Sequence, residues 1–350
     1  MSGILLDKAQ GGMWAFFVGD ALGTPCEFGR GRMMKRWTGS FHPTWRLRRI
    51  GRFGHMTSCP VGQVSDDSEM FACLLGSLSS KKGLYDLETA KANYVAWGSS
   101  GCPFMGRNTR ALFSGYKRVK TYTTRYEKQF PSEESKEAAR PNGALMRCWP
   151  LALLPSRALM EEATLQDTSL SNPNDLSVQA SLIYLDILYD LVRGEKVDGR
   201  ERVQSHIERL EGNDYLKDLK VALQDALQPE FKRVITSQGG WVCHALSISL
   251  FHLIQGSSLE GALRHIIETG GDTDTNGAIC CGLLGARYGL AVLERDAWSR
   301  TAIETVRECV QGVYSGPPVE DGEEVFVSRP EIFTPGYCAK ALEIVVKTNG

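Results

Sequence analysis

Apolar residues recur along most of this chain at the spacing that places them on one face of an α-helix. The segment 259–269 shows the pattern clearly, because its apolar side chains share one face and Gly270-Gly271, a typical helix end, follows. Equivalent patterns predict helices over residues 8–22, 66–79, 87–97, 109–116, 176–192, 210–227, 240–253, 259–269 and 276–288. Small residues crowd the last of these segments, so we expect another element to pack very close to its backbone.

Strand patterns are scarce by comparison. The best alternation covers residues 324–327 and is short, and no strand–helix rhythm predicts a parallel sheet. The polar stretch 118–140 and the proline-rich stretch 315–335 are typical of surface loops. We therefore predict an all-α fold, a single domain over residues 1–350 in which these two stretches are loops.

Composition narrows the class of partner. The apolar share of 42% and the charged share of 23% are typical of a globular protein with a large core. A net charge of −1 gives no field that attracts nucleic acid or an anionic membrane, so we expect neither as a partner. No apolar run reaches the roughly 18 residues of a membrane span, and the N-terminus does not have the pattern of a signal peptide. With ten cysteines and no CxxC motif, we expect free thiols in a cytoplasmic (intracellular) protein.

Two acidic clusters, far apart in the sequence, carry the chemistry. The first is Ser65-Asp66-Asp67 and the second is Asp272-Thr273-Asp274-Thr275, and each lies directly ahead of a predicted helix. Hard cations such as Mg²⁺ and Mn²⁺ prefer carboxylate, hydroxyl and water oxygens. If the fold brings the clusters together, the carboxylates share one cavity, and their repulsion would protonate some of them unless cations hold them ionised. The clusters therefore favour a site for divalent cations.

Other interpretations of these clusters are open. Asp and Ser ahead of an apolar run commonly cap helices, although a capping role does not exclude a metal role. Residues 272–277 match the first half of a calcium-binding EF-hand loop, but Leu283 stands where a bidentate Glu must close the coordination shell. Asp66-Asp67 is also close to the Asp-rich motif of all-helical prenyl and terpene synthases, but Met70 stands where the third acid is required.

Further motifs accompany the clusters in a characteristic order. They are Gly19-Asp20-Ala21-Leu22-Gly23 followed by Glu27-Phe28, Gly62-Gln63-Val64-Ser65-Asp66-Asp67, Asn142-Gly143-Ala144-Leu145-Met146-Arg147, and Gly270-Gly271-Asp272-Thr273-Asp274-Thr275 running into Gly285-Ala286-Arg287-Tyr288-Gly289. Their order and spacing resemble the ADP-ribosylglycohydrolase family, which includes the dinitrogenase reductase-activating glycohydrolase and the vertebrate ADP-ribosylhydrolases. The resemblance is strongest over residues 11–289. It implies a compact, orthogonal, multi-helix domain with two divalent cations at the mouth of an ADP-ribose cleft.

The resemblance also implies roles for individual residues. One half of the binuclear metal site matches Ser65, Asp66 and Asp67, and the other half matches Asp272, Asp274 and Thr275. Asp66 and Asp274 are expected to bridge the ions and to be catalytic. Glu27 matches an acid that reaches toward the site, and we expect it to act as a general acid or base and to contact the substrate. Mg²⁺ is the expected cation, with Mn²⁺ as the alternative.

A second set of residues is expected to line the substrate cleft. The family's cleft segment matches Asn142, Gly143, Met146 and Arg147, and the turn Gly98-Ser99-Ser100-Gly101 is a further candidate for holding a diphosphate through backbone N–H groups. Two positions depart from the family pattern. Asn172 stands where relatives often carry a His, and it can form hydrogen bonds but cannot carry a proton charge. Phe104 stands where the nitrogenase-linked branch has an Asp.

The activity that the resemblance implies is metal-dependent hydrolysis of the glycosidic bond between ADP-ribose and a protein side chain, with arginine-linked adducts favoured over serine-linked ones. The expected partners are ADP-ribose and ADP-ribosylated proteins. The alternative is a catalytically inactive relative that binds ADP-ribose or a partner protein. Phe104 and Asn172 keep it open because both remove groups that could move protons. The intact carboxylates argue against it, since a binding module does not need a repulsive cluster of like charges.

Overall fold

The computed structural model describes residues 2–28, 45–48, 56–59, 61–100, 102, 104–115, 119–232, 239–313 and 335–350, and it confirms the all-α prediction. The helices in these ranges are α1 (Ser2–Gly23), α2 (Asp66–Ser80), α3 (Leu87–Gly98), α4 (Arg107–Phe113), α5 (Val119–Gln129), α6 (Glu133–Glu137), α7 (Arg157–Ser169), α8 (Asp175–Val192), α9 (Gly199–Arg209), α10 (Lys217–Ala226), α11 (Val242–Gln255), α12 (Leu259–Thr269), α13 (Thr273–Tyr288), α14 (Leu290–Leu293), α15 (Ala297–Val313) and α16 (Pro335–Asn349). The 3₁₀ turns η1 (Thr24–Cys26), η3 (Trp149–Leu153) and η4 (Asp214–Leu216) connect some of them.

Several boundaries differ from the sequence prediction. The polar stretch expected to be a loop contains α5 and α6, and Ser132 caps the second of these helices. The helix predicted over residues 210–227 begins only at Lys217, because a turn through Gly212, whose φ is 80°, and the 3₁₀ turn η4 come first, and α9 was not predicted. A small antiparallel hairpin, β1 (Trp45–Arg48) and β2 (Met56–Cys59), pairs Trp45 with Cys59 and was not predicted. The strand expected over 324–327 and the loop expected over 315–335 lie outside the described residues, except Pro335, which begins α16.

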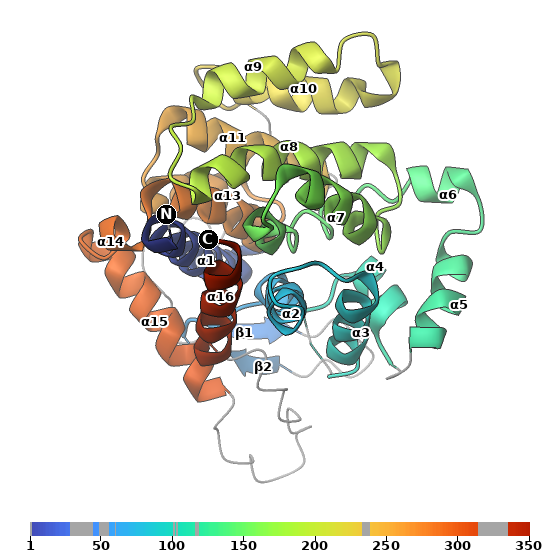
Figure 1. The fold of residues 1–350 in the computed structure, drawn as a ribbon, viewed down its shortest axis with the longest axis horizontal. Helices are drawn as coiled ribbons and strands as arrows, with labels where there is room; N and C mark the ends of the chain where they lie inside the picture. Colours follow the sequence, from blue (N-terminus) through green and yellow to red (C-terminus); the bar gives the residue numbers. More distant parts are fainter. Residues whose placement is uncertain are drawn as a thin grey trace.

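The closest helix packing joins α1 to α13, and Figure 1 shows α1 near the centre of the molecule with α13, α15 and α16 around it. Glycines allow this contact. A methyl group built on Gly19 would lie 2.2 Å from the carbonyl oxygen of Gly277, and one built on Gly23 would lie 2.2 Å from that of Thr273. This confirms the close approach predicted for the Gly-rich segment. As a result, the C-terminal end of α1 lies against the first turn of α13.

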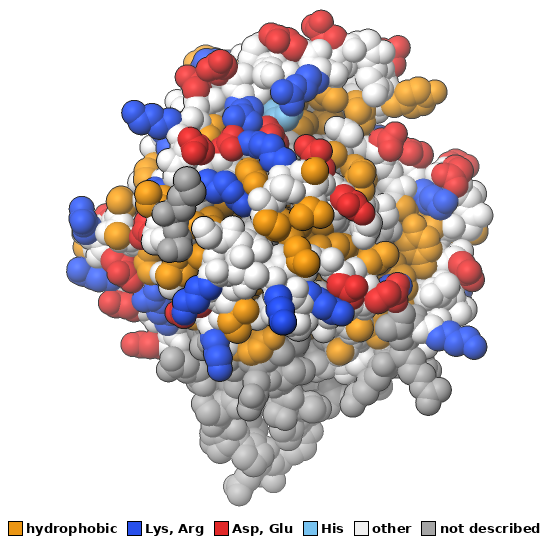
Figure 2. Space-filling model, viewed as in Figure 1, with side chains coloured by type: hydrophobic (Ala, Val, Ile, Leu, Met, Phe, Trp, Pro, Cys, Tyr) orange, Lys and Arg blue, Asp and Glu red, His pale blue; other side chains and the backbone are white. Residues whose placement is uncertain are grey.

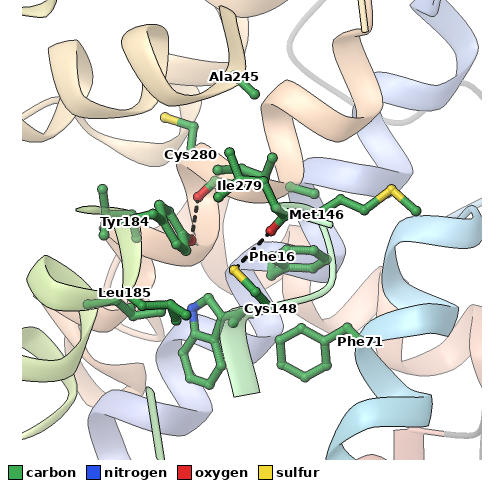
Figure 3. Close-up of a cluster of buried hydrophobic side chains, with 14 of the residues drawn as sticks. Phe16, Phe71, Met146, Cys148, Tyr184, Leu185, Ala245, Ile279 and Cys280 are labelled. Carbon is green, nitrogen blue, oxygen red and sulfur yellow. Dashed lines mark hydrogen bonds between the residues drawn. The ribbon is translucent and has the colours of Figure 1, made fainter. Parts of the chain in front are cut away.

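Aromatic side chains fix α2 against this helix pair. The ring of Phe71 on α2 lies 5.0 Å from that of Phe16 on α1 and 5.4 Å from that of Trp149 in η3, centroid to centroid. On the other side of α13, the Tyr184 hydroxyl of α8 donates to the Ile279 carbonyl at 2.9 Å (Figure 3). These rings are buried, and they hold α1, α2 and α13 in one packed unit with the N-terminal turns of α2 and α13 at the end of α1.

The surface carries both signs of charge. On the face shown in Figure 2, Lys and Arg side chains are interspersed with Asp and Glu, in agreement with the net charge of −1. Among the residues that the structure describes, no helix is both long enough and apolar enough to cross a membrane.

Candidate active site

The fold brings the two acidic clusters together. Asp20, Asp67 and Asp274 each offer a carboxylate oxygen within 4.8 Å of the others, and Glu27, Asp272 and Asp274 form a second group by the same measure. Asp274 belongs to both groups. Sequence reasoning placed the two clusters in one site, but it missed Asp20 as a member.

The first cluster begins α2. Ser65 is the N-cap: its hydroxyl oxygen accepts a hydrogen bond from the Asp67 backbone N–H at 3.3 Å and its hydroxyl donates to Asp67 Oδ2 at 2.9 Å. The capping interpretation is therefore correct for Ser65. The other oxygen of Asp67, Oδ1, is buried and has no hydrogen-bond partner within the described part of the chain. A buried, unpartnered carboxylate oxygen carries a large desolvation cost, which a cation would offset.

The Asp66 carboxylate contacts the segment that precedes α4. The backbone N–H of Gly106 donates to Asp66 Oδ2 at 3.4 Å. The segment that contains Phe104 therefore runs beside the first cluster, and the Phe104 side chain itself is half-buried and packs against the hydrophobic core. An apolar ring occupies this position instead of an acid.

The second cluster begins α13. Gly270 and Gly271 both have positive φ, 79° and 82°, which turns the chain sharply between α12 and Asp272. The Thr273 hydroxyl donates to the Gly23 carbonyl at 2.7 Å and so ties the cluster to α1. Asp274 Oδ1 accepts from the Thr275 backbone N–H at 3.0 Å. Because the chain is already helical from residue 273, it does not form the EF-hand loop considered above.

Glu27 follows η1, directly after α1. Its neighbour Phe28 donates its backbone N–H to the Gly271 carbonyl at 2.9 Å, which anchors this segment beside the second cluster. Burial raises the pKa of Glu27 to about 8, with repulsion from Asp272 and Asp66 adding to the effect. The side chain is half-buried, so it stands at the edge of the acidic site.

The electrostatics of the acids agree with a cation site. Burial, and then repulsion from Asp20, raises the pKa of Asp66 to about 7. Burial also raises the pKa values of Asp67 and Asp274 well above their usual range, with further repulsion from neighbouring acids. The protein alone cannot keep all of these carboxylates charged. The set of carboxylate and hydroxyl oxygens, the last from Ser65 and Thr275, is the one that hard divalent cations select.

Arg147 and Met146 belong to the predicted cleft segment, but both side chains are buried. Arg147 is 1% exposed and all its contacts are within the protein: it pairs with Asp167 at 2.9 Å and donates to the Gly143 carbonyl at 2.8 Å and the Ser171 hydroxyl at 2.7 Å. Met146 lies among buried hydrophobic side chains (Figure 3). Both side chains therefore anchor the segment in the protein interior.

Asn172 is also buried and supports the same segment. Its amide donates to the carbonyls of Ala139 and Pro141, at 2.9 and 2.8 Å, and its oxygen accepts from the Ser171 hydroxyl at 2.7 Å. Both amide hydrogens are therefore used to shape the chain just before Asn142. Asn142 itself reaches the site, because its amide donates to Asp272 Oδ2 at 2.9 Å.

The predicted turn Gly98-Ser99-Ser100-Gly101, a candidate for holding a diphosphate, begins at the last residue of α3. The backbone N–H groups of Ser99 and Ser100, expected to hold a diphosphate, donate to the Ala96 and Trp97 carbonyls at 3.2 and 2.8 Å, and their hydroxyls donate to the Val95 and Trp97 carbonyls. Gly98 packs against α4, where an added methyl group would lie 2.2 Å from the Phe113 carbonyl oxygen. Gly101 lies outside the described residues.

A cavity of about 530 Å³ opens beside the second cluster. Its lining residues are Phe28, Ala138, Arg140, Pro141, Asp218, Gly239, Gly240 and Trp241. Gly240 separates the cavity from the acids, because a methyl group built on it would lie 3.0 Å from Asp272 Oδ2. Sequence reasoning missed Trp241, which follows Gly240, and Arg140, which lies two residues before Asn142.

Comparison with known proteins decides the family. Residues 1–317 match the sequence profile described as ADP-ribosylglycohydrolase. The chain belongs to the ADP-ribosylglycohydrolase family. It is 26% identical over 306 residues to the ADP-ribosyl-dinitrogen reductase glycohydrolase of Rhodospirillum rubrum, covering 86% of this chain and 92% of that protein. It is 23% identical over 323 residues to the Escherichia coli protein YegU, which is uncharacterized, covering 82% and 90%.

A solved structure titled ADP-ribosylglycohydrolase-related protein complex has the same fold, with a TM-score of 0.57 at 21% identity over 88% of this chain and 99% of that one. Membership of the ADP-ribosylglycohydrolase family confirms the resemblance drawn from the motifs. It also supports a hydrolase that acts on an ADP-ribosyl glycosidic bond. The family is generally metal-dependent, and the acids described above are groups that could hold a metal.

Proposed function

We propose that this protein removes ADP-ribose from a modified protein side chain by hydrolysing the bond at the anomeric carbon, and that arginine-linked adducts are preferred over serine-linked ones. The observation that carries the proposal is the convergence of Glu27 and the two acidic clusters at the end of α1. The preference for arginine rests on the stretch from Gly19 to Phe28, which is similar to that of the arginine-acting bacterial enzymes.

Six residues are the proposed cation ligands: Ser65, Asp66, Asp67, Asp272, Asp274 and Thr275. The open Oδ1 of Asp67 and the repulsion among the acids both support this assignment. Two divalent cations, Mg²⁺ or Mn²⁺, would supply positive charge and Lewis acidity beside the sugar. Asp66 and Asp274 would hold the cations together with the other four residues, and Asp274 belongs to both groups of acids.

The protein's own groups would then act on the substrate. Cleavage of the glycosidic bond develops positive charge at the anomeric carbon and requires a proton for the leaving group and a water molecule for the sugar. Glu27 stands at the edge of the cluster, half-buried, where a carboxyl group can exchange a proton with water or with the leaving group. An arginine adduct leaves as a strongly basic guanidine, so its departure requires such a proton donor.

The cavity beside Gly240 is the proposed place for the ADP portion. Phe28 and Trp241 offer aromatic surface to a planar base, and Arg140 offers positive charge at the rim, where it also pairs with Asp218 at 3.4 Å. The adjoining backbone at Asn142 and Gly143 would line the passage toward Asp272. This arrangement would leave the modified side chain facing Glu27 and solvent.

The test is release of ADP-ribose from arginine-linked and serine-linked peptides, each with Mg²⁺, with Mn²⁺ and with a chelator. Metal-dependent release from the arginine-linked peptide is the expected result. Faster release from the serine-linked peptide would reverse the preference but keep the activity. No release from either peptide, together with measurable ADP-ribose binding, would favour the inactive binding module instead.

A Glu27→Gln variant separates chemistry from binding. We expect slower turnover with ADP-ribose affinity largely retained, because the amide keeps the size of the side chain but cannot donate or take up the proton. Glu195→Gln, at an exposed acid between α8 and α9, is the control and is expected to behave as the unmodified protein. Equal loss of binding and turnover in Glu27→Gln would mean that Glu27 holds the segment in place.

A further inference from the structure

The carboxylate of Asp20 is fully buried and engaged by the protein on both oxygens. Oδ2 accepts from the Ser68 hydroxyl at 2.5 Å, from the Ser68 backbone N–H at 3.1 Å and from the Ser65 backbone N–H at 3.0 Å. Oδ1 shares the same Ser65 N–H at 3.0 Å, and it lies 3.2 Å from the Thr24 hydroxyl, whose proton goes to the Asp20 backbone carbonyl at 2.7 Å. Three hydrogens from the start of α2 therefore hold the Asp20 carboxylate, chiefly through Oδ2.

Asp67 belongs to the same group of three acids but shows the opposite pattern. Its Oδ2 accepts from the Ser65 hydroxyl, and its Oδ1 is buried with no hydrogen-bond partner among the described residues. Asp20 and Asp67 are thus alike in residue type and burial but differ in what occupies their oxygens. Asp67 has an oxygen to give to a cation, whereas the oxygens of Asp20 face backbone N–H groups.

Those N–H groups belong to the start of α2. The first backbone N–H groups of a helix have no partner within it, and a carboxylate beside them is favoured by hydrogen bonding and by the helix dipole. Ser65 caps the Asp67 N–H from within the segment, and Asp20 caps the Ser65 and Ser68 N–H groups from α1. Asp66 and Asp67 lie between Ser65 and Ser68 in the sequence, so the orientation of their side chains depends on Asp20.

We propose that Asp20 is a positioning residue that holds Asp66 and Asp67 in the geometry the cations require, and that it is not itself a cation ligand. This inference rests on the proposed cation site. Sequence reasoning did not include Asp20 in the site. The proposal gives it the role of orienting the first turn of α2 from α1. The same contact couples the α1–α13 pair to the first cluster, because Asp20 is one residue from Gly19, where α1 meets Gly277.

The test compares four variants of the full chain by calorimetric titration with Mn²⁺, thermal unfolding without metal, and ADP-ribose release. Asp20→Asn is expected to keep the stoichiometry of the unmodified protein while cation affinity or turnover falls about 10- to 100-fold, the range for residues that orient metal ligands. Asp67→Asn is expected to lose stoichiometric binding. Ser68→Ala removes one donor from Asp20 and should show a smaller loss. Ser77→Ala is the matched control, because its hydroxyl is buried on the same helix without a hydrogen-bond partner among the described residues.

Two results would overturn the proposal. If Asp20→Asn loses stoichiometry as Asp67→Asn does, Asp20 is a ligand; if it binds and turns over like the unmodified protein, it positions nothing. If Asp20→Asn fails to fold, Ser68→Ala provides the test. Mn²⁺ affinity and turnover equal to those of Ser77→Ala would contradict the proposal. If the unmodified protein binds Mn²⁺ but releases no ADP-ribose, the proposed function is refuted. The Mn²⁺ titration of Asp20→Asn would still test the role of Asp20. An unmodified protein that binds no Mn²⁺ would remove the site and this inference with it.

Discussion

The side-chain amide of Asn142 donates to Oδ2 of Asp272 at 2.9 Å, although 130 positions separate the two residues in the sequence. The backbone around Asn142 is fixed on both sides. Asn172 holds the Pro141 carbonyl at 2.8 Å, and Arg147 holds the Gly143 carbonyl at 2.8 Å. The buried Arg147 and Asn172 therefore act on the site through Asn142, which sets the direction of one carboxylate of the second cluster.

Replacing Asn142 by Ala should lower cation affinity or turnover about 10- to 100-fold, because Asp272 loses the donor that orients it. The stability cost should be only about 1 kcal/mol, the net value of an ordinary hydrogen bond. Asn93→Ala is the matched control, since Asn93 donates to the Cys73 carbonyl at 3.0 Å away from the acids. A similar loss of activity in both variants, measured at matched fractions of folded protein, would contradict a specific role for Asn142.

Replacing Asp274 by Asn should have opposite effects on the protein with and without metal. Without metal, we expect a melting temperature at or above that of the unmodified protein, because one of several mutually repelling buried acids becomes neutral. With Mg²⁺, we expect the metal-induced rise in melting temperature to shrink and turnover to be abolished, since both acid groups include Asp274. Normal hydrolysis by this variant would refute the metal assignment.

The sequence predicted most reliably what local patterns encode. The helix over 259–269 has the predicted bounds because its apolar face, its Ser258 cap and the following glycines all agree. The convergence of the two acidic clusters could be anticipated from chemistry, since like charges at two helix starts call for a shared partner. The late start of α10 was harder to predict, because the apolar periodicity continues across Gly212 and only its positive φ reveals the turn.

Long-range polar contacts were not predictable in this way. Arg147 carries a charge and by default belongs at the surface, yet a carboxylate, a ring and three further oxygen acceptors offset the cost of its burial. Asp20 lies in a motif noted from the sequence, but its role depends on Ser65 and Ser68, 45 and 48 positions away. No local pattern contains such a partner, so only the fold identifies it.

The approach of α1 to α13 predicts a sharp contrast between two glycines of α1. Gly19→Ala should destabilise the protein by about 3 kcal/mol or more, because its methyl group would lie 2.2 Å from the backbone oxygen of Gly277 and neither helix backbone can yield easily. Gly3→Ala, on the same helix with nothing within 4 Å of the added methyl group, should be neutral or slightly stabilising. Urea unfolding of both variants measures the difference. Equal stabilities would mean that the two helices separate without cost.

A pair of histidines, the buried His252 and the half-buried His265, predicts how stability depends on pH. His252 Nε2 lies 3.1 Å from His265 Nδ1, and His252 Nδ1 lies 2.9 Å from the Ser257 hydroxyl. Burial, and then the neighbouring His265, lowers the pKa of His252 to about 3. Burial also lowers the pKa of His265, although Glu268 opposes this shift. Both effects favour neutral rings in the folded state.

In the unfolded chain His252 takes up a proton near pH 6.5, whereas in the folded protein it stays neutral until about pH 3. The unfolded state therefore binds more protons between these values, and the free energy of unfolding falls as the pH drops below about 6.5, by about 1.4 kcal/mol per pH unit for this one group. A His252→Gln variant removes that proton uptake. Because other acids titrate over the same range, the measure is the difference between the two proteins in urea unfolding at pH 7.5 and pH 5.0. We expect the unmodified protein to lose about 2 kcal/mol more than the variant; equal losses would show that the histidine pair accepts a proton in the folded state.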